Sequence, residues 1–247
     1  HSLHRRQRQM CIRDSSIPEE LGDVASAVGE VNTRFHTTGE ELEGQTTLFL
    51  QFAKITGGDV VSSVDSADKV LKTFGKTSDD ASGLLGMVAK AAQDTGINAQ
   101  GLMDDVLANS ATFKELNFSL EESVNFMALL DENGVESGTA LAGLKKAVVN
   151  LTDAGMSESE ALQTVIDKIK NAGSETEALT IAQETFGTKG AAEMATAIRE
   201  GRLSLDDLSA SMADYSTVVT DTYNNTMDGV DGATTAANAA KIAMSTL

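Results

Sequence analysis

The sequence predicts an all-α fold, a multi-helix bundle of short antiparallel helical hairpins. Three observations predict it. The 247 residues contain a single proline, the residue that helix interiors tolerate least. Helix-start signals recur along the chain, and glycines follow many of the expected helix ends. Between these marks apolar residues recur at helical spacing, and no segment alternates apolar and polar residues as a strand does.

Capping boxes mark the helix starts. In this motif a serine or threonine caps a backbone N–H three residues on, and an acid at that position reaches back to the cap. The pairs are Ser16/Glu19, Thr38/Glu41, Ser119/Glu122, Ser157/Glu160 and Ser174/Glu177, with Ser204/Asp207 as a variant. We also expect Asn98 to cap a helix. Left-handed glycine caps are expected at the helix ends Gly75, Gly96, Gly134, Gly155 and Gly187.

The apolar stripes place the helices between these caps. Val60, Val64, Ala67 and Leu71 share one helix face, whereas 124–130 has almost no polar face and should lie centrally in the bundle. The expected helices are 17–35, 39–56, 58–74, 78–95, 98–115, 119–133, 137–154, 158–172, 175–186, 189–200 and 205–240. The last is either one longer C-terminal helix or broken near Gly229 and Gly232. Short connections favour hairpins, and the irregular glycine spacing argues against a solenoid.

The first fifteen residues differ from the rest. They hold four arginines and one acid, namely Arg5, Arg6, Arg8, Arg13 and Asp14. A basic arm for nucleic acid and a targeting sequence are two interpretations, but the apolar run of a signal peptide is missing and the stretch resembles a translated adapter sequence. We therefore treat 1–15 as a non-native or disordered segment. The predicted helical domain is 16–215, and 216–247 begins a following helical or linker segment of a chain cut at both ends.

The remaining chain is strongly acidic. Of 19 basic and 37 acidic residues, 15 and 36 lie beyond residue 15, a net charge of −21. Nucleic acids and anionic lipids bind through lysine and arginine, so we expect no direct nucleic-acid binding by this region. No apolar run reaches the roughly 18 residues of a membrane span.

Residue types that carry catalysis are scarce. Cys11 is the only cysteine, and His36 is the only histidine beyond residue 15, so we predict no catalytic, cofactor-binding or metal site. His36 is expected at an exposed helix end. The acid pairs Asp79–Asp80, Glu121–Glu122 and Asp206–Asp207 fall in first helical turns, where they complement the helix dipole.

Three other motifs have a structural interpretation that outweighs a functional one. Asp104–Asp105 is expected on a solvated helix face. The Phe49 and Phe52 face is either a membrane-active patch or core, and the surrounding acidity favours core. The run 228–232 lacks the ligand spacing of a calcium loop and is expected to be a turn.

Several short stretches, in order, closely resemble the core region of phage tail tape measure proteins. They are Val28–Phe35, Thr38–Leu42, Phe52–Thr56, Phe74–Ser78, Asp94–Ile97, Asn117–Glu122 and Glu184–Gly187. The resemblance extends from about residue 17 to 215. It implies a structural protein without a substrate, which lies in the lumen of the virion tail tube, sets tube length and leaves ahead of DNA. Host cytoplasm is the implied location during assembly.

The resemblance also implies the partners: the tail-tube major protein, tail assembly chaperones, and distal tail or baseplate proteins, with self-association left open. A continuous helix of this length would span about 370 Å, yet the frequent caps predict a compact domain that opens or stacks lengthwise in the tube. Two alternatives from other classes remain: a tail-associated peptidoglycan-cleaving enzyme fragment, and an acidic helical partner-binding module.

Overall fold

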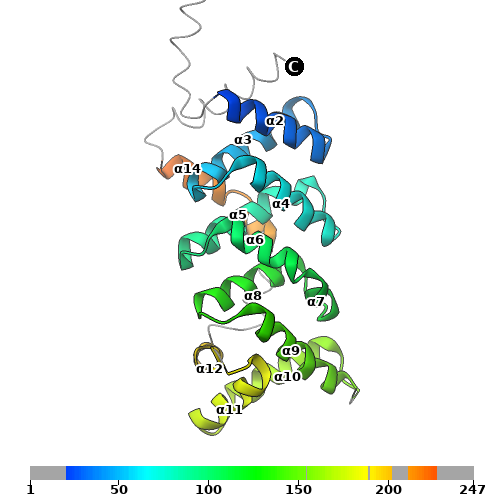
Figure 1. The fold of residues 1–247 in the computed structure, drawn as a ribbon, viewed down its shortest axis with the longest axis vertical. Helices are drawn as coiled ribbons and strands as arrows, with labels where there is room; N and C mark the ends of the chain where they lie inside the picture. Colours follow the sequence, from blue (N-terminus) through cyan, green and yellow to red (C-terminus); the bar gives the residue numbers. More distant parts are fainter. Residues whose placement is uncertain (1–20, 154, 189, 202–210, 227–247) are drawn as a thin grey trace, which may run out of the picture.

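The computed structural model describes residues 21–153, 155–188, 190–201 and 211–226 (Figure 1). Every regular element in these residues is helical, which confirms the predicted all-α class. In chain order the elements are α2 (Leu21–Phe35), α3 (Gly39–Thr56), α4 (Val60–Thr73), η1 (Ser78–Asp80), α5 (Ala81–Thr95), α6 (Ala99–Ala108), α7 (Ser110–Glu115), α8 (Leu120–Glu132), α9 (Ser137–Thr152), α10 (Glu158–Lys170), α11 (Glu175–Phe186), α12 (Ala191–Arg199), η2 (Met212–Tyr215) and α14 (Val218–Thr226).

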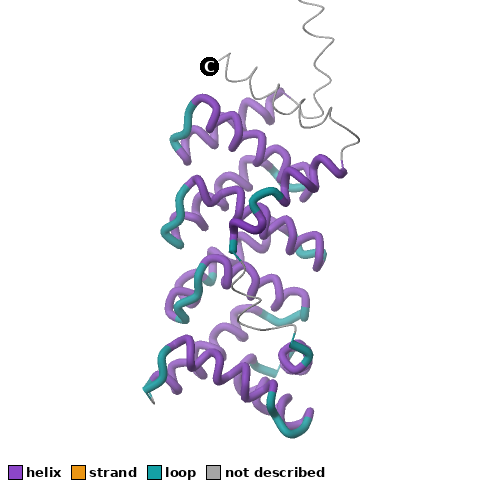
Figure 2. Tube along the Cα trace, turned by 180° about the vertical axis from the view of Figure 1, so that it is seen from behind, coloured by secondary structure: helices purple, strands orange, loops and turns teal. Residues whose placement is uncertain are grey.

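The helices up to α12 form an elongated stack of hairpins (Figures 1 and 2). Alternate helices contact one another along its two sides, α2 with α4 and α4 with α6 on one, α3 with α5 and α5 with α8 on the other. The irregular glycine spacing argued against a solenoid. The main contacts nevertheless join helices that are near in sequence, as they do in a solenoid. Helices of unequal length still stack, because each one presents apolar residues to the pairs before and after it.

The predicted caps within the described residues are largely confirmed. Ser119 and Ser157 form full capping boxes with Glu122 and Glu160. Ser174 caps the N–H of Glu177, whose carboxylate accepts from the N–H of Gly173 in place of the cap. The glycines predicted as caps all have positive φ, although ψ of Gly187 is 172°, outside the left-handed helical region.

Two predicted details of the helix starts differ from the structure. Thr38 is the N-cap of α3, but its side chain makes no cap hydrogen bond, and Gly39 begins the helix at φ +61°. The box predicted there with Glu41 is therefore wrong. Asp59 caps α4 by accepting from the N–H of Ser62 at 2.7 Å, a start that the predicted boxes did not include.

The helix predicted over 98–115 is two helices that meet at Asn109. The Asn98 cap is confirmed, since its side chain accepts from the N–H of Gly101 at 2.7 Å. At the break, Nδ2 of Asn109 donates to the carbonyl of Asp105 at 2.8 Å. The backbone N–H of Asn109 still donates to the same carbonyl at 3.1 Å, so the break is a local change of the backbone angles to φ −99° and ψ 5°, of which apolar periodicity carries no trace. The break lets α7 contact α9.

The segment after α12 is not one helix from 205. Ser211 caps the short 3₁₀ helix η2 by accepting from the N–H of Ala213 at 3.2 Å, and α14 begins only at Val218. In Figure 1 this segment, in orange, lies beside α3 and α5, in the first half of the stack. The predicted starts at Ser16 and Ser204, the breaks near Gly229 and Gly232 and the turn at 228–232 lie outside the described residues.

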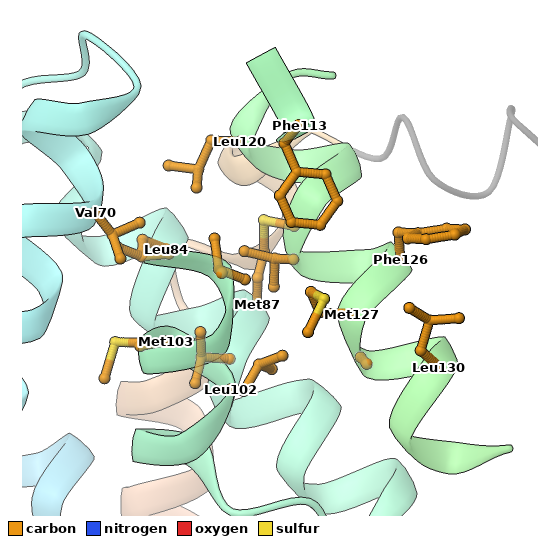
Figure 3. Packing of buried hydrophobic residues seen from close by; sticks show 14 of the residues in the cluster. Val70, Leu84, Met87, Leu102, Met103, Phe113, Leu120, Phe126, Met127 and Leu130 are labelled. Atoms are coloured by element: carbon orange, nitrogen blue, oxygen red, sulfur yellow. The ribbon is translucent and has the colours of Figure 1, made fainter. Parts of the chain in front are cut away.

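One continuous core runs through the stack. Figure 3 shows its middle, where side chains from α4 to α8 meet. Three phenylalanines from α7, α8 and the loop between them form an aromatic cluster: Phe118 lies 5.6 Å from both Phe113 and Phe126, centroid to centroid. The apolar helix at 124–130 is central as predicted, because α8 contacts α5, α6 and α9.

Candidate functional site

The single histidine outside the first fifteen residues lies at a helix end. His36 follows α2, has φ +57° and is exposed, as predicted. Its N–H donates to the carbonyl of Asn32 at 3.0 Å, which continues the last turn of the helix. This position is structural.

The predicted first-turn acid pairs also have structural partners. Glu122 completes the capping box of α8, and Glu121 forms an ion pair with Lys76 at 3.1 Å. In η1, the carboxylate of Asp80 accepts from the N–H of Thr77 at 2.9 Å, and Asp79 lies in the same turn. Asp206–Asp207 lies outside the described residues.

Asp104 and Asp105 are exposed, which confirms the predicted solvated face. Asp104 accepts hydrogen bonds from Ser66 at 2.8 Å and from Gln100 at 3.0 Å, so that it links α6 to α4. Asp105 has no such role. Although the residue is exposed, the neighbouring protein partly desolvates its carboxyl group and so raises the pKa, and the negative charges of Asp131 and Asp104 raise it further.

Because Asp105 is exposed, solvent screens the repulsion on its carboxylate, and we expect Asp105→Asn to stabilise the protein at pH 7 by only a few tenths of a kcal/mol. A carboxyl group whose pKa is raised on folding favours the folded state when protonated, and this stability is lost as pH rises through the folded-state pKa. The gain should therefore vanish below about pH 3.9, the unfolded-state pKa, when urea unfolding is measured from pH 3 to 7. Asp104→Asn is the matched control, since it weakens the acceptor of two hydrogen bonds and should give no gain. An equal gain at both ends of the pH range would contradict the electrostatic explanation.

One acid that sequence reasoning passed over is buried between helices. Asp68 in α4 is 4% exposed and forms an ion pair with Lys72 at 2.9 Å. Arg34 in α2 lies 3.8 Å from Asp68 and 2.7 Å from Asp65, and also pairs with Glu30. The Asp68/Lys72 spacing of four residues was a local signal for one pair, but nothing local indicated the arginine. This network joins α2 to α4 and leaves Asp68 paired.

The phenylalanine face of α3 belongs to the core. Phe49 and Phe52 are fully buried, and Phe49 stacks on Phe35 with 5.8 Å between ring centroids. The core interpretation is therefore confirmed over the membrane patch. None of the described helices is long and apolar enough to cross a bilayer.

The described residues bring together no group of three or more histidine, cysteine or acidic side chains suited to a metal ion. Surface grooves exist, and one between α11 and α12 is lined by Glu175, Leu179, Ala195, Arg199 and Glu200 among others. Both glutamates are exposed. An acid catalyst needs a desolvated carboxyl group, so this groove does not provide the chemistry of sugar-polymer cleavage.

Comparison with known proteins gives one partial similarity to report. The chain is 27% identical over 116 residues to a protein described as "Tape measure protein" of Pneumococcus phage Dp-1. The match covers 46% of this chain and 10% of that protein, so this chain spans only a small part of its relative's length. No family model and no solved structure matches. The chain is thus similar in part to a tape measure protein.

Proposed function

We propose that this chain is part of a phage tail tape measure protein, a structural tail assembly protein that sets tube length and fills the tube lumen until ejection. The observation that carries the proposal is the partial similarity to the tape measure protein of phage Dp-1. The stacked helices support it, because helical hairpins with mainly local contacts can be separated lengthwise without threading one segment through another.

The charge supports the same role. A protein that shares a channel with DNA must leave without binding to it, and a net charge of −18 opposes contact with phosphate groups. The proposed partners are the tail-tube major protein, the assembly chaperones, and distal tail or baseplate proteins. The proposed location is the virion tail, with the host cytoplasm during assembly.

A deletion in the phage that encodes this chain tests the proposal. Removing 137–199, which holds α9 to α12, shortens an extended helical ruler by about 95 Å at 1.5 Å per residue. We expect tails shorter by about that length in electron micrographs. Gly44→Ala serves as the control of unchanged length, since a Cβ at this helical position meets no atom within 4 Å. Deletion tails of normal length would refute the ruler.

A zymogram with the purified chain distinguishes this function from cell-wall cleavage. The two glutamates that line the groove between α11 and α12, Glu175 and Glu200, are exposed and so lack the desolvation of an acid catalyst, and we expect no clearing in a zymogram of cell walls. Clearing by the purified chain would overturn the structural proposal. Capture of the tail-tube protein, compared with capture of secretion-system components, would separate it from a general acidic binding module.

A further inference from the structure

Two glycines on one face of α5 receive the backbone of the C-terminal segment. A Cβ built on Gly83 would lie 2.5 Å from Cβ and 2.7 Å from the carbonyl oxygen of Met212. A Cβ on Gly86 would overlap the carbonyl oxygen of Tyr215 and approach its carbonyl carbon to 2.8 Å. Glycine inside a helix is destabilising relative to alanine, because it loses more backbone freedom on folding. Helix α5 bears this cost twice, at the positions where η2 comes closest.

The segment 211–226, named here the clasp, is held by further contacts on α3 and α5. Met212, Val219 and Tyr223 are buried, the last two at 0% and 1% exposure. Oγ1 of Thr220 donates to Oε1 of Gln51 at 3.2 Å, and Nε2 of Gln93 donates to Oγ1 of Thr222 at 3.1 Å. The clasp thus packs on a defined surface of α3 and α5, which is made of small, apolar and amide side chains.

The clasp also differs from the stack in the range of its contacts. The main contacts among α2 to α12 join helices that are near in sequence, whereas η2 and α14 return across the second half of the stack to α5 and α3. Figure 2 shows the same placement from behind. Each helix of the stack is therefore supported by its own neighbours without the clasp.

Helix α14 depends on its contacts with α3 and α5. Its described residues, VVTDTYNNT, are all weak helix formers, and most of the stability of such a helix comes from packing and little from propensity. Docking and folding of the clasp are therefore coupled. The surface that the clasp covers contains Gln51, which is 3% exposed. When the clasp dissociates, the side chain of Gln51 can form hydrogen bonds with water.

We propose that residues 211–226 form a releasable clasp, which locks the first half of the stack and unfolds as a unit while α2 to α12 remain folded. Its release makes the α3 and α5 face accessible and removes the contacts of η2 and α14 with these helices, so it is the first step by which this stack can open. The proposal concerns the chain itself and stands whether or not the protein belongs to a phage tail.

Gly86→Ala in the full chain tests the proposal by changing the surface of α5 on which the clasp packs. The methyl group displaces η2 and at the same time favours helix α5, so amide protection in 212–226 should fall about tenfold to a hundredfold while that of 137–186 stays the same. Hydrogen exchange read by mass spectrometry measures both regions. Gly44→Ala is the matched control, a helical glycine with open space around its Cβ, and should leave clasp protection unchanged.

A second variant tests the proposal by changing a residue of the clasp itself. Tyr223→Ala alters no stack residue and should reproduce the selective loss of protection. In the unaltered chain, exchange at rising urea concentration should show 212–226 opening before any helix of the stack. Equal loss of protection in clasp and stack would show that the segment is an integral part of the core. Full clasp protection in both variants would show that these contacts do not hold it. Either result overturns the proposal.

Discussion

Phe126→Ala is expected to lower the free energy of unfolding by about 3–5 kcal/mol. The ring is 2% exposed and meets Phe118 edge-on at 5.6 Å and Phe113 at 6.4 Å, centroid to centroid. Truncation leaves a cavity where α7 and α8 meet, and edge-to-face pairs add stabilisation beyond buried area. A whole domain has only about 5–15 kcal/mol of stability, so the loss should shift the urea midpoint strongly.

Phe74→Ala provides the control for this substitution. Phe74 is only partly buried at the end of α4, so the same truncation removes less buried surface and leaves an opening to solvent. Its loss should be about half as large. Equal losses at the two positions would contradict the central role of the aromatic cluster, and a negligible loss at Phe126 would mean that α7 and α8 close over the cavity.

The helices themselves could be predicted from the sequence because their signals are local. The predicted bounds 39–56 and 175–186 coincide with α3 and α11, since Ser174 caps α11 and a glycine follows each helix end, Gly57 and Gly187, even though Thr38 makes no cap hydrogen bond. The break at Asn109 was missed, because a local change of the backbone angles leaves the apolar spacing intact. Periodicity identifies a buried face but not the structure that covers it.

The contacts between distant segments could not be predicted for the same reason. Gly83 and Gly86 look like any glycines inside an apolar helix, and only the fold shows that residues 212 and 215 lie against them. The scarcity of catalytic residue types could be predicted from the composition. The ion-pair network around the buried Asp68 could not, because it depends on how α2 crosses α4. Spacing along one helix cannot specify the side chain that approaches from another.

Gly143→Ala is expected to destabilise the far end of the stack by about 1–3 kcal/mol. A Cβ at this position of α9 would overlap the carbonyl oxygen of Thr185 in α11 and reach 2.8 Å from its carbonyl carbon. Both atoms belong to the backbone, so no side-chain rotation relieves the overlap and the two helices must move apart. The better helix propensity of alanine offsets at most about 1 kcal/mol.

The position of the damage distinguishes this variant from Phe126→Ala. Because the main contacts of α9 to α12 are with one another and with α7 and α8, hydrogen exchange should rise in 137–199 and change little in α2 to α6. Gly44→Ala, with no atom within 4 Å of its Cβ, should instead be neutral or slightly stabilising. Uniform loss of protection along the chain would show that the stack unfolds as one cooperative unit, in which case neither the clasp nor the α9 to α12 end could open alone.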